Sequence, residues 1–118
     1  MGKGTILLVD DDTVSSQILS LILTDEGYVV ELAETGKLGV EKVSAKKFDL
    51  VLLDFFLPDM KGHDASVMMK KVSQDTKIVL LTGNSNSEDE KIDKEYERVL
   101  LKPIHPEVII KTISEILG

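Results

Sequence analysis

Five short apolar runs divide the 118-residue chain, and each gap between them is long enough for a helix. Val, Ile and Leu dominate these runs, which occupy residues 5–9, 28–33, 50–53, 78–81 and 99–101. Runs of this length and composition are typical of buried strands. Strands that alternate with helices predict an α/β fold in which helices cover both faces of a parallel sheet. At this length we expect a single domain, residues 1–118.

Helical patterns fill the gaps between the runs. In the first gap Asp12 is the expected N-cap. The apolar residues that recur there at helical spacing are Val14, Ile18, Leu21 and Ile22. In the third gap we expect Val67, Met68 and Val72 to face the core. Pro106 is suited to the first turn of a last helix.

Composition excludes several classes of function. Fourteen basic and 21 acidic residues give a net charge of −7, and Arg98 is the only arginine, so direct binding to nucleic acid or to anionic membranes is not expected. The chain has no cysteine, which excludes disulfides and thiolate chemistry. His63 and His105 lack metal-site spacing, and we expect both at the surface without a role. No apolar run has the length of a membrane span, and a cytoplasmic location is expected.

Chemically active side chains follow four of the five apolar runs. Aspartates occupy positions 10–12 after the first run, and Asp54, Thr82 and Lys102 follow the third, fourth and fifth. The carboxyl ends of parallel strands meet at one edge of a sheet, where ligands bind in such folds. Clustered carboxylates repel one another and need a cation, for which Mg²⁺ is the natural choice. With a hydroxyl and an ammonium group beside them, they predict a phosphoryl site with a carboxylate as acceptor.

The motifs "ILLVDDD", "LVLLDFFLPDMKG", "VLLTG" and "LLKPI", in this order, resemble the receiver domain of two-component response regulators, in particular the stand-alone, chemotaxis-regulator-like form. The resemblance covers essentially the whole chain. It implies a flavodoxin-like, doubly wound, five-stranded parallel sheet of order 2-1-3-4-5. It also implies that Asp54 accepts a phosphoryl group from a phosphohistidine, with Thr82 as the switch hydroxyl and Lys102 as the ammonium that pairs with the phosphoryl group. Such a domain is not an enzyme beyond its own phosphorylation and dephosphorylation.

The resemblance further implies a ligand set and partners. Asp11 and Asp54 would bind Mg²⁺ directly, Asp10 through water, and the backbone carbonyl of Phe56 would complete the protein ligands. The phosphodonor would be a sensor histidine kinase or a phosphotransfer protein, and the output a downstream protein target. The domain is expected to be a monomer or a phosphorylation-dependent dimer. If residues 1–118 are an excised piece, a DNA-binding domain is missing.

Two features depart from the family pattern. Most receivers have Tyr or Phe three residues before the lysine, where this chain has Val99, so coupling between the threonine and an aromatic ring is altered. Tyr96 is a candidate to replace this aromatic residue, but nothing in the sequence indicates where its side chain lies. Segment 83–98 is short and polar, and our hypothesis is that phosphorylation orders or shifts it. Phe56 and Asn84 occupy positions that tune dephosphorylation in the family.

Two alternatives remain open at this point. "LLVDDDTV" fits the pattern of haloacid-dehalogenase-like phosphatases, with Asp10 as nucleophile and Asp12 as acid. That family needs a further acidic pair after the lysine, and after Lys102 only the acids of the last helix remain. It also leaves Asp54 unexplained. The second alternative is a phosphorylation-independent pseudo-receiver, which the complete set of site residues argues against.

Overall fold

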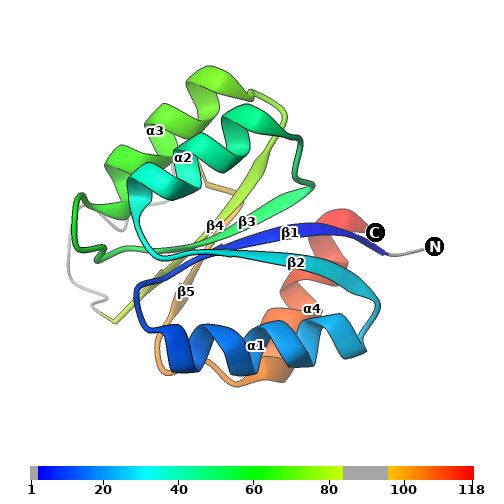
Figure 1. Ribbon diagram of the computed structural model, residues 1–118. Coiled ribbons are helices and arrows are strands. Elements are labelled where there is room, and N and C mark those ends of the chain that lie inside the picture. The colour runs from blue at the N-terminus through cyan, green and yellow to red at the C-terminus, as the bar shows by residue number, and fades with distance from the viewer. Residues whose placement is uncertain (1–2, 84–95) are drawn as a thin grey trace.

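A computed structural model describes residues 3–83 and 96–118, and its centre is a parallel sheet. The strands are β1 (Gly4–Val9), β2 (Tyr28–Ala33), β3 (Leu50–Asp54), β4 (Lys77–Thr82) and β5 (Arg98–Leu101). Their order in the sheet is β2-β1-β3-β4-β5 (Figure 1). The predicted α/β class and strand order are confirmed. The order reverses between β1 and β3, so a crevice is expected beyond the carboxyl ends of these two strands.

Four helices pack on the described part of the sheet. They are α1 (Thr13–Asp25), α2 (Gly36–Ala45), α3 (Gly62–Val72) and α4 (Pro106–Leu117). Figure 1 shows α2 and α3 on one face of the sheet and α1 and α4 on the other. The helical pattern expected in the gap between the fourth and fifth apolar runs falls mostly on residues 84–95, outside the described residues, as does Asn84. No described helix has the length and apolar character needed to cross a membrane.

The core consists of two layers separated by the sheet. Alternate residues of β1 enter opposite layers, because successive side chains of a strand point to opposite faces. Leu7 and Val9 pack in the α2–α3 layer, whereas Ile6 and Leu8 pack in the α1–α4 layer. All four are at most 1% exposed. Burial on both faces explains why the central strands are uniformly apolar instead of alternating.

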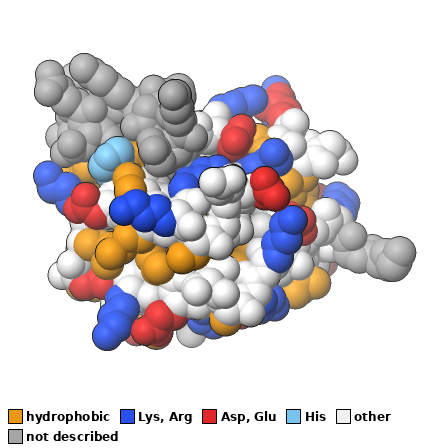
Figure 2. All heavy atoms as spheres, turned by 90° about the horizontal axis from the view of Figure 1, so that it is seen from above, with side chains coloured by type: hydrophobic (Ala, Val, Ile, Leu, Met, Phe, Trp, Pro, Cys, Tyr) orange, Lys and Arg blue, Asp and Glu red, His pale blue; other side chains and the backbone are white. Residues whose placement is uncertain are grey.

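The helices bury different faces from those that periodicity alone suggests. On α3, Met69 is fully buried, but Met68 and Val72 are 47% and 50% exposed, and Val67 is only half-buried. The prediction that Met68 and Val72 face the core is therefore wrong. Ala65 and Met69 lie four residues apart and fill the available depth, so their neighbours are turned outward. Figure 2 views this side of the molecule, where hydrophobic side chains lie exposed among charged ones.

Helix α1 carries the larger exposed apolar face. Val14, Ile18 and Leu21, which share the periodic face, are 66%, 55% and 72% exposed. The helix instead buries Ser16 and Leu23 against the sheet. The apolar set of α1 is wider than the face that the sheet covers, so part of it points to solvent.

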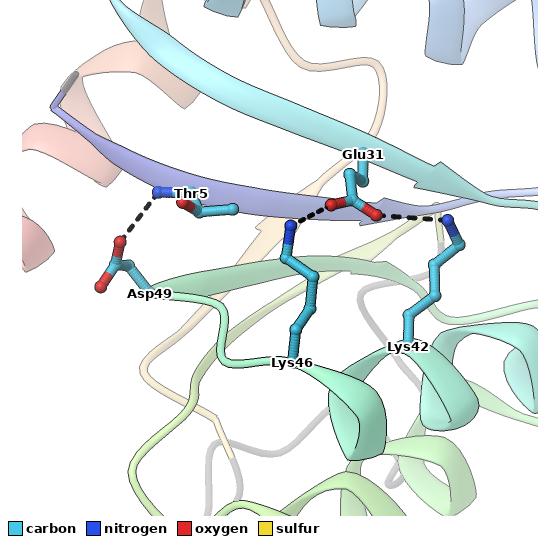
Figure 3. Close-up of polar contacts among 5 residues, drawn as sticks. All are labelled: Thr5, Glu31, Lys42, Lys46 and Asp49. Atoms are coloured by element: carbon cyan, nitrogen blue, oxygen red, sulfur yellow. Dashed lines mark hydrogen bonds and ion pairs between the residues drawn. The ribbon is translucent and has the colours of Figure 1, made fainter. Parts of the chain in front are cut away.

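Polar contacts fasten the edge strand β2 and the start of β1. Glu31 of β2 lies between Lys42 and Lys46, and its carboxylate is 3.3 Å from the Lys42 ammonium (Figure 3). The hydrogen bond from Lys46, followed by the contacts with Lys42, lowers the pKa of Glu31. Asp49 accepts a hydrogen bond from the Thr5 backbone N–H at 2.8 Å (Figure 3). Charged side chains along an edge strand also discourage pairing with another chain.

The loop between β3 and α3 is held against the start of α2. The carboxylate of Asp59 accepts hydrogen bonds from the backbone N–H groups of Gly36 and Lys37, both at 2.9 Å. The Thr35 hydroxyl caps the same helix by accepting from the Leu38 N–H at 3.0 Å. The bond from Lys37 is the main reason that the pKa of Asp59 is lowered. These contacts fix the loop that leaves the carboxyl end of β3.

We expect Asp59→Ala to lower the free energy of unfolding at neutral pH by about 1 kcal/mol, because two N–H groups at the start of α2 lose their partner. Because folding lowers the pKa of Asp59, its contribution is present above the unfolded pKa, near 3.8, and is lost as pH falls through the lower folded value. Urea unfolding of wild type and variant across acidic pH measures this. Asp59→Asn should lose an intermediate amount, since its single amide oxygen can accept from only one of the two N–H groups, and it should lack the pH dependence of the carboxylate. Equal stability of Asp59→Ala and wild type at pH 7 contradicts the prediction.

Candidate functional site

Three carboxylates meet where the chain leaves β1 and β3. One oxygen each from Asp10, Asp11 and Asp54 lies within 4.8 Å of the others. Asp10 and Asp54 are only 8% and 7% exposed, whereas Asp11 is open to solvent. Asp12 has a different task, because its side chain accepts from the Ser15 N–H at 3.1 Å and caps α1. The predicted capping role of Asp12 is confirmed.

The lysine that follows β5 enters this carboxylate cluster. The Lys102 ammonium lies 3.0 Å from Oδ1 of Asp54 and 3.5 Å from Oδ2 of Asp10. Its backbone N–H donates to the carbonyl of Thr82 at 2.6 Å, which joins the ends of β4 and β5. Thr82 itself is fully buried at the end of β4. The structure thus brings together the acids and the lysine that the sequence places after separate strands.

The loop after Asp54 closes tightly. Phe56 pairs with Lys61 in an isolated β-bridge, and the Gly62 N–H donates to the carbonyl of Phe55 at 2.6 Å. The ring of Phe56 is 58% exposed and packs edge-on against Phe55, with ring centroids 4.8 Å apart. Phe56 therefore lies in the short loop that directly follows Asp54. The role of its carbonyl as a metal ligand stays a prediction.

Burial and like charge together disfavour ionisation of Asp54. Burial raises the pKa of the Asp54 carboxyl, Lys102 partly opposes this, and the charges of Asp10 and Asp11 add to the rise. For Lys102, burial alone lowers the pKa, but the hydrogen bond and charge of Asp54, with Asp10, outweigh it, so the pKa lies above its usual value. One ammonium therefore does not fully compensate the three acids.

The donor set fits a hard divalent cation. Three carboxylates with oxygens in mutual reach, one of them open to solvent, supply anionic oxygen ligands and leave space for bound waters. A cation there would also oppose the effects of burial and of the charges of Asp10 and Asp11, which raise the pKa of Asp54. The cluster is therefore suited to a divalent metal ion.

Mg²⁺ is expected to stabilise the fold, because it binds a cluster that exists only in the folded chain. At a free concentration of about 100 times Kd, the free energy of unfolding should rise by about 2.7 kcal/mol. Thermal unfolding with Mg²⁺ and with EDTA measures the gain. Asp54→Asn should lose most of it, and K⁺ at matched ionic strength serves as the control for screening. An unchanged melting temperature in Mg²⁺ rules out binding at this cluster.

Comparison with known proteins identifies the family and the fold. The sequence model of the response regulator receiver domain family matches residues 6–114. The chain belongs to this family. Receiver domains are phosphoacceptor signalling domains that interact with histidine kinases or phosphotransfer proteins. Receiver domains also bind Mg²⁺ at an acidic pocket of this kind.

Individual relatives agree with this assignment. The cell cycle transcriptional regulator CtrA of Caulobacter vibrioides is 32% identical over 116 residues, which are 95% of this chain and 49% of CtrA. The CheY-like receiver domain of Methanospirillum hungatei superposes with a TM-score of 0.91 at 33% identity and covers 96% of this chain and 92% of its own. The response regulator TrrA of Thermotoga maritima, solved with Mg²⁺ and BeF, has a TM-score of 0.86 at 27% identity, with 98% and 99% covered. This receiver chain spans about half the length of the curated relatives it matches.

The receiver fold also holds polar contacts that the sequence did not indicate. His63, expected at the surface without a role, is half-buried and lies 2.7 Å from the hydroxyl of Tyr96. His105 is exposed as expected, but its Nδ1 accepts from the Glu107 N–H at 3.2 Å and caps α4. The His63 contact joins residues 33 positions apart, and no local pattern signals such a pair. The N-cap position of His105, directly before Pro106, was a signal that could have been used.

Proposed function

We propose that Asp54 is the phosphoacceptor of a two-component phosphorelay and takes its phosphoryl group from a phosphohistidine. The observation that carries the proposal is the Lys102 ammonium 3.0 Å from Oδ1 of a buried carboxylate that two further aspartates flank. A carboxylate with a purely structural role would not be stabilised by two further carboxylates beside it. A carboxylate that receives a phosphoryl group needs positive charge held ready on both sides.

The transfer follows from the residues in place. A carboxylate oxygen of Asp54 attacks phosphorus, the P–N bond of phosphohistidine breaks, and its electron pair stays on the imidazole nitrogen, leaving an acyl phosphate. Lys102 neutralises one phosphoryl oxygen and the Thr82 hydroxyl donates to another. Asp10, Asp11, Asp54 and the Phe56 carbonyl would hold Mg²⁺, which supplies further positive charge to the transferring group.

The exposed face of α1 is suited to the phosphodonor. Residues 13–24 contain no charged side chain, in a chain in which 30% of residues are charged. Val14, Ile18 and Leu21 form an exposed stripe at helical spacing that begins just after Asp12, at the edge of the sheet that carries the cluster. A stripe of this kind packs against a partner helix by ridges into grooves. A helical histidine-bearing protein seated there lies next to Asp54.

A cavity of about 530 Å³ extends this surface between α1 and the chain that follows β5. Its walls include Ile18, Pro103 and Ile104, and it reaches Asp10 and Lys102. The hydroxyl of Ser16 also lines it, buried and without a hydrogen-bond partner among the described residues. A partner side chain with one polar group at its end would fill the cavity and pair with this hydroxyl.

Ile18→Asp is expected to slow phosphoryl transfer from a phosphorylated histidine phosphotransfer protein by about tenfold or more, because a charge enters the centre of an apolar contact. Uptake from a small phosphodonor such as acetyl phosphate should be unchanged, since it needs no docking surface. Val108→Asp is the matched control, being an exposed apolar residue of α4 (46%) outside the cavity wall. Equal slowing by both variants, or none by Ile18→Asp, contradicts docking on α1.

The test of the proposed function is direct. The protein is incubated with acetyl phosphate and Mg²⁺ and then weighed by mass spectrometry. The expected result is the gain of one phosphoryl group, which EDTA prevents and hydroxylamine removes, as it does for an acyl phosphate. No gain in the presence of Mg²⁺ overturns the proposal and leaves the pseudo-receiver reading in its place.

The phosphatase alternative is not favoured. It requires Asp12 as a general acid facing the substrate, but the side chain of Asp12 accepts hydrogen bonds from the Ser15 N–H and hydroxyl. It also makes Asp10 the nucleophile, with no function for Asp54.

CtrA is by name a transcriptional regulator, so the output of a longer chain can include DNA. For these 118 residues we propose a protein partner and no direct contact with nucleic acid, given the charge of −7.

A further inference from the structure

A buried tyrosine and a half-buried histidine meet on the α3 side of the sheet. Tyr96 is 5% exposed, packs in the α2–α3 layer of the core, and has its hydroxyl 2.7 Å from Nδ1 of His63. The two rings are inclined at 74°, with centroids 6.0 Å apart. His63 is the second residue of α3, and Tyr96 lies two residues before β5. One hydrogen bond therefore connects the start of α3 to the start of β5.

Because the His63–Tyr96 hydrogen bond is largely buried, it favours one relative position of α3 and the start of β5. Breaking a hydrogen bond to a buried group costs about 1 kcal/mol net, and up to roughly 1–3 kcal/mol where the group finds no new partner. A small relative shift of α3 and the start of β5 would break the bond while leaving most apolar contacts of the ring in place. The energy of the hydrogen bond therefore depends more steeply on the relative position of α3 and β5 than does the energy of the surrounding apolar contacts.

Both ends of the pair are tied to chain segments that carry site residues. Just before His63, the Gly62 N–H donates to the Phe55 carbonyl at 2.6 Å, and a Cβ at Gly62 would lie 2.7 Å from the carbonyl oxygen of Asp54. The first turn of α3 is therefore pressed against the backbone of the acceptor residue. It cannot stay in place if that backbone moves toward it.

The β5 end is fixed in the same manner. The Glu97 N–H, next to Tyr96, donates to the Ile78 carbonyl at 2.7 Å, which attaches this point to β4. β5 then runs to Leu101, directly before Lys102. Val99, on the same strand, is partly buried against the same core layer. Its side chain has no polar group, so it cannot form a hydrogen bond that a movement of β5 would break. Among residues 96–101, Tyr96 is the aromatic side chain, and it packs in this core layer.

We propose that the His63–Tyr96 hydrogen bond couples occupation of the phosphorylation site to the position of the start of β5. The inference rests on the proposed function, because it needs a phosphoryl group at Asp54. Coupling of this kind is reciprocal: if occupation changes the strength of the pair, removal of the pair changes the affinity of the site by the same factor. The affinity of the site is therefore the decisive readout, and a merely structural hydrogen bond would leave it unchanged.

The first experiment measures the affinity of the Mg²⁺-loaded protein for beryllofluoride, a phosphoryl mimic, by calorimetry. Tyr96→Phe removes only the hydroxyl, and we expect an affinity change of at least about fivefold relative to wild type. His63→Ala should give a similar change, and the double variant no more than either single variant, because all three lack the same bond. Tyr28→Phe is the matched control, a second tyrosine that is 4% exposed, at the start of β2, and it should bind as wild type does.

A second experiment follows Tyr96 without disturbing the pair. The chain has two tyrosines and no tryptophan, so Tyr28→Phe leaves Tyr96 as the only strong fluorophore. Its emission should change when Mg²⁺ and beryllofluoride bind, and this change should disappear when His63→Ala is added. Wild-type affinity in Tyr96→Phe, together with constant Tyr96 emission, overturns the coupling while the proposed function stands. Failure of beryllofluoride and acetyl phosphate to react with the wild type overturns both.

Discussion

Asp54→Asn is expected to gain no phosphoryl group from acetyl phosphate in Mg²⁺, whereas Asp10→Asn is expected to be phosphorylated more slowly. An amide oxygen is a far weaker nucleophile than a carboxylate, so the variant loses the acceptor. It also loses one of the three negative charges expected to hold the cation, which lowers phosphorylation further. Under the proposed function, Asp10 would supply negative charge around the cation and would form no bond to phosphorus. Intact-mass measurement of the wild type and both variants over the same time course gives the comparison.

The pair of variants also separates the two chemical readings of the acidic cluster. A phosphatase with Asp10 as nucleophile would lose its covalent intermediate in Asp10→Asn and keep it in Asp54→Asn. The receiver gives the opposite pattern. Asp49→Asn serves as a control outside the cluster, because that carboxylate accepts the Thr5 N–H at the amino end of the sheet. Phosphorylation of Asp54→Asn to the wild-type level is the result that refutes Asp54 as acceptor.

The meeting of the acids and the lysine could be predicted from the sequence, because each of these residues directly follows a recognisable strand. Asp10, Asp54, Thr82 and Lys102 each follow an apolar run at once, and parallel strands place their carboxyl ends at one edge. The strand order came only from the resemblance to receivers. Once that order is given, Asp54 ends β3 and Lys102 directly follows β5, on either side of β4, and a long lysine side chain spans the distance.

Other contacts could not be predicted, since they join segments whose approach depends on packing. Asp59 binds the start of α2 from more than 20 positions away, and its sequence context indicates only a turn. Periodicity identified α1 as a helix but not the exposure of Val14 and Ile18, because it does not reveal how much of a helix the sheet covers. His63 and Tyr96 form a hydrogen bond only because folding brings the start of α3 next to the start of β5.

Gly62→Ala is expected to destabilise the fold by about 2 kcal/mol or more, since overpacking against backbone cannot be relieved by a side-chain rotation. An added Cβ would lie 2.7 Å from the Asp54 carbonyl oxygen and 2.8 Å from the Phe55 Cα, closer than real contacts allow. Relief requires α3 to move away from β3, which also breaks the bond from the Gly62 N–H to Phe55. Denaturant unfolding measures the loss.

Gly83→Ala is the matched control for that substitution, because no described residue outside its chain neighbours lies within 4 Å of the Cβ it would add. Its stability should stay within about 0.5 kcal/mol of wild type. The comparison separates the close approach at Gly62 from the effect that any glycine-to-alanine change has on the unfolded chain, which by itself stabilises the fold by roughly 0.4–1 kcal/mol. Equal stability of the two variants would mean that α3 can withdraw freely from the Asp54 backbone. The first turn of α3 could then transmit no displacement from the acceptor residue to His63, so the Gly62 contact is the structural condition on which coupling to β5 depends.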